Sequence, residues 1–145
     1  ADAAVKQLAV HSDASRIKQV LLNLLSNAFK FTFAGAITIG VRTVTLAERA
    51  YLQFTVTDTG IGIRQKDIGK LFTLFGMLDN SGHGCGIGLT VSKKYIEHLD
   101  GRIRLRSEYG KGTQVRFVIP YTNLPQQLES QSQNLRSPQS SESLN

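Results

Sequence analysis

Apolar residues recur at steps of three and four between residues 15 and 31, which predicts an amphipathic helix. The apolar stripe consists of Ile17, Val20, Leu21, Leu24, Leu25 and Ala28. Asp13 or Ser12 precedes it, and either side chain is suited to accept a hydrogen bond from the free N–H groups of the first turn. We therefore expect a helix over Ser15–Phe31 with one apolar face.

Two later segments alternate between apolar and polar positions, as half-buried strands do. Ile37–Val44 places Ile37, Ile39 and Val41 on one face. Tyr51–Asp58 places Leu52, Phe54 and Val56 on one face and Gln53, Thr55 and Thr57 on the other. The same alternation directs Asp58 toward the apolar face at the end of its strand.

Two helices and two strands are expected in the remainder. A short helix near Gln65–Phe75 would place Ile68, Leu71, Phe72 and Phe75 together, and a helix over about Leu89–Leu99 would end at Asp100-Gly101. Strands Arg102–Ser107 and Thr113–Ile119 are joined by a glycine-containing hairpin loop. Helices and antiparallel strands are mixed without strict βαβ alternation. The pattern therefore predicts an α+β fold, a two-layer α/β sandwich whose helices cover one face of a mostly antiparallel sheet.

The chain of 145 residues is long enough for one domain with its own core, which we place at residues 1–121. Residues 122–145 are rich in Ser and Gln and contain no aromatic residue. Such a segment buries too little apolar surface to offset its ordering entropy, so we expect a disordered tail or linker.

Charge and cysteine content narrow the function classes. The net charge of +6 attracts anions, whether nucleotide, nucleic acid or an acidic partner domain. The single Cys85 excludes an internal disulfide and suits a reducing compartment, so we expect a cytoplasmic location. No apolar run approaches the ~20 residues of a membrane span, so no membrane contact is expected from this segment.

Asn23, Asn27 and Lys30 are spaced four and three apart and share one face of the first helix. Two amide oxygens and an ammonium group there could hold a hydrated Mg²⁺ and the phosphates that it bridges. The alternative is that they are only the polar flank of an amphipathic helix.

Asp58 precedes the turn Gly60-x-Gly62, where missing side chains let a planar ligand approach the backbone. A carboxylate on the buried side of a strand is costly unless it is hydrogen-bonded, and one that accepts from an exocyclic amine would select adenine. The alternative is a plain turn, in which Asp, Thr and Gly are common.

Glycines at 82, 84, 86 and 88 precede the helix over Leu89–Leu99, and their N–H groups together with the helix N-terminus suit an anion. The alternative is a mobile loop without a ligand. The segment is not a P-loop, because no Gly-Lys-Ser/Thr follows. His83, Cys85 and His98 do not have the spacing of a zinc site.

Arg102, Arg104 and Arg106 alternate along one predicted strand, and Arg116 could join them across the hairpin. No aromatic pattern typical of RNA-binding sheets interleaves them. We interpret them as the solvent face of an amphipathic sheet, and we expect no nucleic-acid contact.

The combination resembles the catalytic ATP-binding domain of sensor histidine kinases, within the gyrase/Hsp90/MutL-type ATPase superfamily. Five segments in order carry the resemblance over roughly residues 8–121: Asp13–Thr32 is similar to the N box, Asp58–Ile63 to the G1 box, Phe72-x-x-Phe75 to the F box, Gly84–Leu89 to the G2 box, and Ser107–Pro120 to the closing hairpin.

The resemblance implies a Bergerat fold that holds ATP and Mg²⁺ between helices and sheet. Asn27 would bind Mg²⁺, Asn23 and Lys30 would contact the phosphates, and these three would be the catalytic residues. Asp58 would bind the adenine amino group. The remaining pocket residues would be Gly60, Gly62, Ile63, Gly84, Gly86, Gly88, Leu89 and Thr113. Phe72 and Phe75 would anchor the lid or meet the phosphoacceptor domain.

The resemblance also implies partners. Hydrolytic members of the superfamily carry a Glu general base where this chain has Asn23, which favours transfer of the γ-phosphate to a protein histidine. The acceptor would lie on a dimerisation domain of the same or a partner kinase, with a response-regulator receiver domain downstream in a two-component phosphorelay. A nucleotide-binding, pseudokinase-like regulatory module without phosphotransfer is the alternative.

Overall fold

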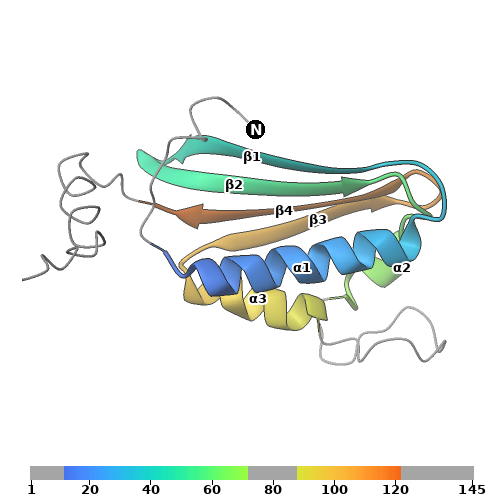
Figure 1. Ribbon diagram of the computed structural model, residues 1–145, viewed down its shortest axis with the longest axis horizontal. Coiled ribbons are helices and arrows are strands. Elements are labelled where there is room, and N and C mark those ends of the chain that lie inside the picture. Colours follow the sequence, from blue (N-terminus) through green and yellow to red (C-terminus); the bar gives the residue numbers. More distant parts are fainter. Residues whose placement is uncertain (1–11, 72–87, 122–145) are drawn as a thin grey trace, which may run out of the picture.

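The computed structural model describes residues 12–71 and 88–121. Their elements follow in the order α1 (Ala14–Phe31), β1 (Ile37–Leu46), β2 (Arg49–Asp58), α2 (Gln65–Ile68), α3 (Gly88–His98), β3 (Arg102–Glu108) and β4 (Gly112–Pro120). The four strands form one antiparallel sheet in the order β1-β2-β4-β3. Helices α1 and α3 lie side by side on one face of this sheet (Figure 1). The predicted two-layer α+β sandwich is confirmed.

The core lies between the helices and the inner face of the sheet. Helix α1 contributes the stripe predicted from its sequence, of which Val20, Leu24 and Ala28 are buried. The sheet contributes Leu52, Phe54, Val56, Val115, Phe117 and Ile119, and α3 contributes Ile96. Phe54 and Phe117 face each other across β2 and β4, with stacked rings 4.7 Å apart. Asp58 lies two residues after Val56 in the strand register, so it is on the same inner face that its spacing predicted, and it is half-buried there.

Local signals explain where the two long helices begin and end. The carboxylate of Asp13 accepts from the backbone N–H of Arg16 at 3.0 Å, which satisfies one free donor of the first turn of α1. Helix α3 ends where Asp100 takes a φ of +55°, and the N–H of Gly101 then donates to the carbonyl of Ile96 at 2.8 Å. No helix within the described ranges is long and apolar enough to cross a membrane.

Two local predictions need correction. Helix α2 ends at Ile68, whereas the apolar spacing predicted a helix through Phe75. Gly69 is a poor helix former, and the chain continues in three-residue turns, with the N–H of Leu71 donating to the carbonyl of Ile68. The part of that prediction from residue 72 onward lies outside the described residues, as does the predicted tail 122–145.

The β1–β2 hairpin is longer and tighter than predicted. Its turn consists of Ala47 and Glu48 alone, with φ of +46° and +64°. Positive φ at both central residues is the geometry of a type I′ turn, which matches the twist of the flanking strands. Gly or Asn usually occupies such positions, so the sequence carried no signal for this turn.

Candidate functional site

The end of β2 is fixed by the carboxylate of Asp58. One oxygen, Oδ1, accepts from the N–H of Gly60 at 2.9 Å and from the N–H of Thr113 on β4 at 3.2 Å. The other oxygen, Oδ2, accepts no hydrogen bond from the part of the chain that the structure describes. Asp58 is half-buried on the inner face, so its free oxygen is available to a donor that enters between sheet and helices.

The turn after Asp58 requires glycine at two positions. A Cβ at Gly60 would overlap the carbonyl oxygen of Phe31, at the end of α1. Gly62 has a φ of +65°, and a Cβ there would overlap the carbonyl of Glu108 in the β3–β4 hairpin. The turn that follows Asp58 is therefore packed closely between the C-terminal end of α1 and the β3–β4 hairpin.

Ser107 joins the hairpin to the same turn. Its hydroxyl accepts from the N–H of Ile63 at 2.8 Å and donates to the carbonyl of Gly112 at 2.8 Å. A serine has one hydroxyl proton, so Thr113, whose Oγ1 lies 2.9 Å away, donates to Ser107. The structure therefore brings Asp58, Ile63 and Thr113 together as the sequence predicted. Ser107 was missed.

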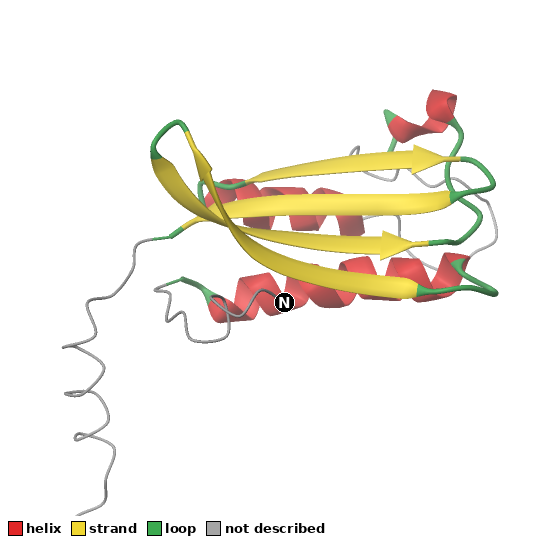
Figure 2. Cartoon of the chain, turned by 90° about the horizontal axis from the view of Figure 1, so that it is seen from above, coloured by secondary structure: helices red, strands yellow, loops and turns green. Residues whose placement is uncertain are grey.

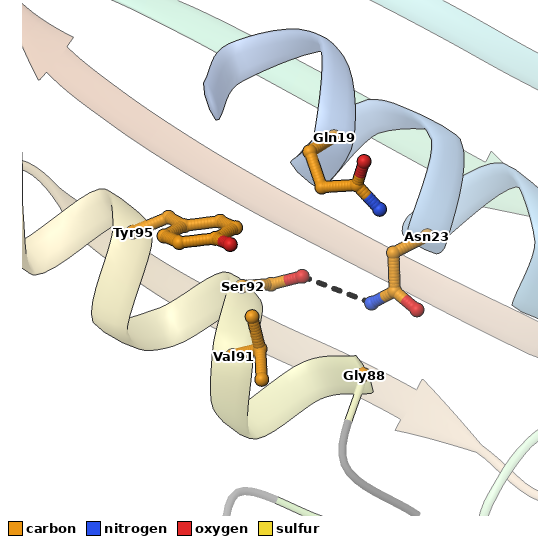
Figure 3. Close-up of a pocket in the computed structure, with 6 residues that line it drawn as sticks. All are labelled: Gln19, Asn23, Gly88, Val91, Ser92 and Tyr95. Carbon is orange, nitrogen blue, oxygen red and sulfur yellow. Dashed lines mark hydrogen bonds between the residues drawn. The ribbon is translucent and has the colours of Figure 1, made fainter. Parts of the chain in front are cut away.

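A second polar cluster lies between α1 and α3. The amide Nδ2 of Asn23 donates to the hydroxyl of Ser92 at 2.9 Å, and Ser92 is 2% exposed. Figure 3 shows the two side chains pointing toward each other, with Gly88 beside them at the start of α3. A Cβ at Gly88 would overlap the Oδ1 of Asn23, so glycine is required there. The bond to Ser92 leaves Oδ1 as the free end of the amide.

A cavity of about 220 Å³ opens beside this cluster. It is lined by Gln19, Asn23, Gly88, Val91, Ser92 and Tyr95 (Figure 3). The cavity extends from Asn23 toward the N-terminal half of α1, away from Asp58. The cavity is therefore a recess beside Asn23, and it is separate from the space beside the Asp58 carboxylate.

The remaining predicted residues fall between or beside these clusters. Asn27 lies one turn beyond Asn23 on α1, and Lys30 lies in the last turn with its ammonium 5.0 Å from the centre of the Phe31 ring. Leu89 follows Gly88 in the first turn of α3 and is half-buried. Gly84, Gly86, Phe72, Phe75, His83 and Cys85 lie outside the described residues.

Known proteins match this chain over most of its length. Residues 12–123 match the family model described as histidine kinase-, DNA gyrase B-, and HSP90-like ATPase, so the chain belongs to that family. It is 38% identical over 82% of its length to the autoinducer 2 sensor kinase/phosphatase LuxQ of Vibrio cholerae. It is 40% identical over 78% of its length to the sensor histidine kinase RcsC of Escherichia coli.

A solved structure agrees with the sequence relatives. The crystal structure of full-length ShkA in complex with AMPPNP matches 81% of this chain with a TM-score of 0.69 and 27% identity. The chain spans 15% of LuxQ, 12% of RcsC and 24% of the ShkA chain. It therefore corresponds to the catalytic ATP-binding domain of sensor histidine kinases, and the predicted resemblance is confirmed.

Proposed function

We propose that this domain binds ATP with Mg²⁺ between α1 and the inner face of the sheet and donates the γ-phosphate to a histidine on a separate domain. The free Oδ2 of Asp58 carries the proposal. Its partner oxygen is already occupied by two backbone N–H groups, so Oδ2 is oriented and left to accept from the exocyclic amine of adenine. Gly60, Gly62, Ile63 and Thr113 shape the pocket around the base.

The phosphates then extend along α1 toward α3. Lys30 and Asn23 contact them, and Gly84, Gly86, Gly88 and Leu89 wrap them where the glycine segment enters α3. The N-terminus of α3 contributes the positive end of the helix dipole, which favours an anion. Asn23, Asn27 and Lys30 are spaced four and three residues apart on α1, so all three can face the phosphates.

The donor set suits Mg²⁺ bound mainly through ATP and water. The described residues contain no group of three or more His, Cys, Asp or Glu side chains that could enclose a metal ion. Mg²⁺ needs few protein ligands when phosphates supply others, and the amide oxygen of Asn27 is a suitable one. When bound, the ion neutralises charge that develops on the phosphates.

Asn23 favours transfer to an acceptor over hydrolysis. An amide does not remove a proton from water, so no general base stands at this position. A histidine nitrogen needs no such base, because its lone pair attacks the γ-phosphorus while the bond to ADP breaks and ADP leaves with the electron pair. Positioning of the acceptor then limits the rate. The acceptor domain, a cytoplasmic location and a downstream receiver domain are parts of this proposal.

Radiolabelled ATP tests the proposal. The isolated chain should bind ATP but neither label itself nor release phosphate appreciably, and a matched acceptor domain should become labelled. The label should be lost in acid and retained in alkali, as expected for phosphohistidine. Rapid phosphate release by the chain alone would favour a hydrolytic ATPase, and ATP binding without transfer to any acceptor would favour the pseudokinase alternative.

A further inference from the structure

The sheet face opposite the helices carries an array of arginines. Figure 2 looks onto this face, with the helices behind the strands. The strand register places six arginines on it. Arg49 lies beside the β1–β2 turn, over the ring of Tyr51. We call the other five the arginine face: Arg42, Arg102, Arg104, Arg106 and Arg116. All are exposed except Arg116, which is half-buried near the middle. The sequence predicted four of these positions, and Arg42 joins them because β1 pairs with β2.

No carboxylate among the described residues neutralises this array. None of the five arginines forms an ion pair with a carboxylate in the described ranges 12–71 and 88–121. Glu108 shares the face at the end of β3, but its carboxylate is 2.6 Å from the ammonium of Lys111 in the hairpin. The arginine face thus gathers five of the chain's 17 Lys and Arg residues on one side of the sheet.

Neutral partners hold two of the arginines in place. The buried amide of Gln53, with its oxygen turned toward Arg42, accepts from Nε at 2.8 Å and from a terminal nitrogen at 3.1 Å. Arg116 donates to the Oε1 of Gln114 at 3.1 Å, and Gln114 donates to the hydroxyl of Thr57. These bonds orient the guanidinium groups without removing their charge. The buried Nε of Arg116 has no partner within the described residues.

The array is unfavourable for the isolated domain. Arg104 and Arg116 are directly opposite each other in the β3–β4 register, and like charges so placed destabilise a sheet. Such repulsion is relieved when an anionic partner binds. Oriented guanidinium groups suit carboxylates, because their planar fork donates two parallel hydrogen bonds.

We propose that the arginine face docks an acidic polypeptide segment or domain surface, rich in Asp and Glu. Among the strand residues on this face, Tyr51 is the single aromatic side chain within the described ranges, and the guanidinium of Arg49 lies over its ring, 5.9 Å from the centre. Sheets that bind single-stranded nucleic acid stack several bases on two or three rings. A four-stranded sheet is also too broad to enter a groove of duplex DNA, which accepts a helix or a two-stranded ribbon. Because the face is opposite the helices, a partner there leaves the site around Asp58 open.

Charge reversal on the intact chain tests the proposal. The probe is a short fluorescent peptide of alternating Glu and Ser, measured by anisotropy. Arg104→Glu combined with Arg106→Glu should weaken binding about tenfold or more. Lys18→Glu combined with Lys94→Glu makes the same change in net charge on exposed positions of α1 and α3, and should weaken binding less than about threefold. Equal losses in both pairs would overturn the proposal, because net charge alone would then explain binding.

Additional variants and probes test the chemical class of the partner and control for misfolding. Arg104→Lys with Arg106→Lys keeps the positive charge but removes the two parallel N–H donors of each guanidinium group. This double variant should lose part of its affinity for the peptide, while its melting temperature stays unchanged. If the Glu variants fail to fold, Arg104→Gln with Arg106→Gln takes their place with the same expectation. A single-stranded oligonucleotide and an anionic vesicle are compared with the peptide at equal charge. If either binds more tightly than the peptide, and the same variants lose that binding, the choice of an acidic polypeptide is overturned.

Discussion

Replacing Asp58 by Asn separates two roles of this carboxylate: it fixes the turn after β2, and we propose that it binds adenine. The amide oxygen of Asn can keep accepting from the N–H groups of Gly60 and Thr113, since both donate to one oxygen. The other position changes from an acceptor to an NH₂ donor, which then faces the amino group of adenine, also a donor. The fold should therefore survive while recognition of adenine is lost.

The expected loss of ATP affinity follows from the hydrogen bond that the substitution removes. A hydrogen bond to a charged group in a desolvated pocket contributes about 1.5–3 kcal/mol, so ATP should bind about 10- to 150-fold more weakly. Inosine triphosphate has an oxygen in place of the amino group of ATP. The Asp58→Asn variant should accordingly lose its preference for ATP over inosine triphosphate, or reverse it.

Isothermal titration with both nucleotides measures the effect, and thermal unfolding measures the fold. Asp58→Ala is the matched control, because it removes the acceptor for both N–H groups and should lower the free energy of unfolding by about 1–3 kcal/mol. An Asp58→Asn variant that bound ATP like the parent, with unchanged nucleotide preference, would refute the reasoning and leave Asp58 as a turn residue.

Three further outcomes follow from particular contacts. ATP should bind more tightly with Mg²⁺ than with EDTA, and Asn27→Ala should abolish that difference in titration calorimetry; equal affinities in the parent chain would contradict the role of Asn27. Ser92→Ala removes the partner of the Asn23 amide and should weaken ATP about 3- to 10-fold, with Ser92→Thr restoring affinity; an effect on urea unfolding alone would indicate a purely structural role. Glu48→Gly should raise the free energy of unfolding by about 0.5 kcal/mol, because relief of its positive φ exceeds the added chain entropy, and a lower urea midpoint would contradict this.

Periodicity was sufficient to predict most of the fold. The stripe of α1 and the alternation in β2 depend on spacing alone, so these elements lie within a few residues of their expected bounds. The same alternation predicted that Asp58 faces the core. The Ala47-Glu48 turn could not be predicted, since neither residue favours positive φ and the tertiary pairing of β1 with β2 imposes it.

Hydrogen bonds between residues far apart in the chain could not be predicted from the sequence. Ser92 and Asn23 are 69 positions apart, and Ser107 and Ile63 are 44 apart. A serine in a helix or a strand carries no local signal for either contact. Gln53 lies on the face opposite Leu52 and Phe54, as predicted, yet it is buried, and its amide lies within hydrogen-bonding distance of Arg42.

Strand β4 links the proposed site to the arginine face through its register. Thr113 pairs with Asp58 on the inner face, and the next outward positions on the same strand are Gln114 and Arg116. Because side chains alternate at every residue, a slip of one position would carry Arg116 into the core and Phe117 into solvent. The cost of that exchange fixes the register, so the positions of the residues on both faces are set together. The N–H of Thr113 donates to Asp58 Oδ1, so the pairing of β2 with β4 that positions this carboxylate also positions Gln114 and Arg116 on the opposite face.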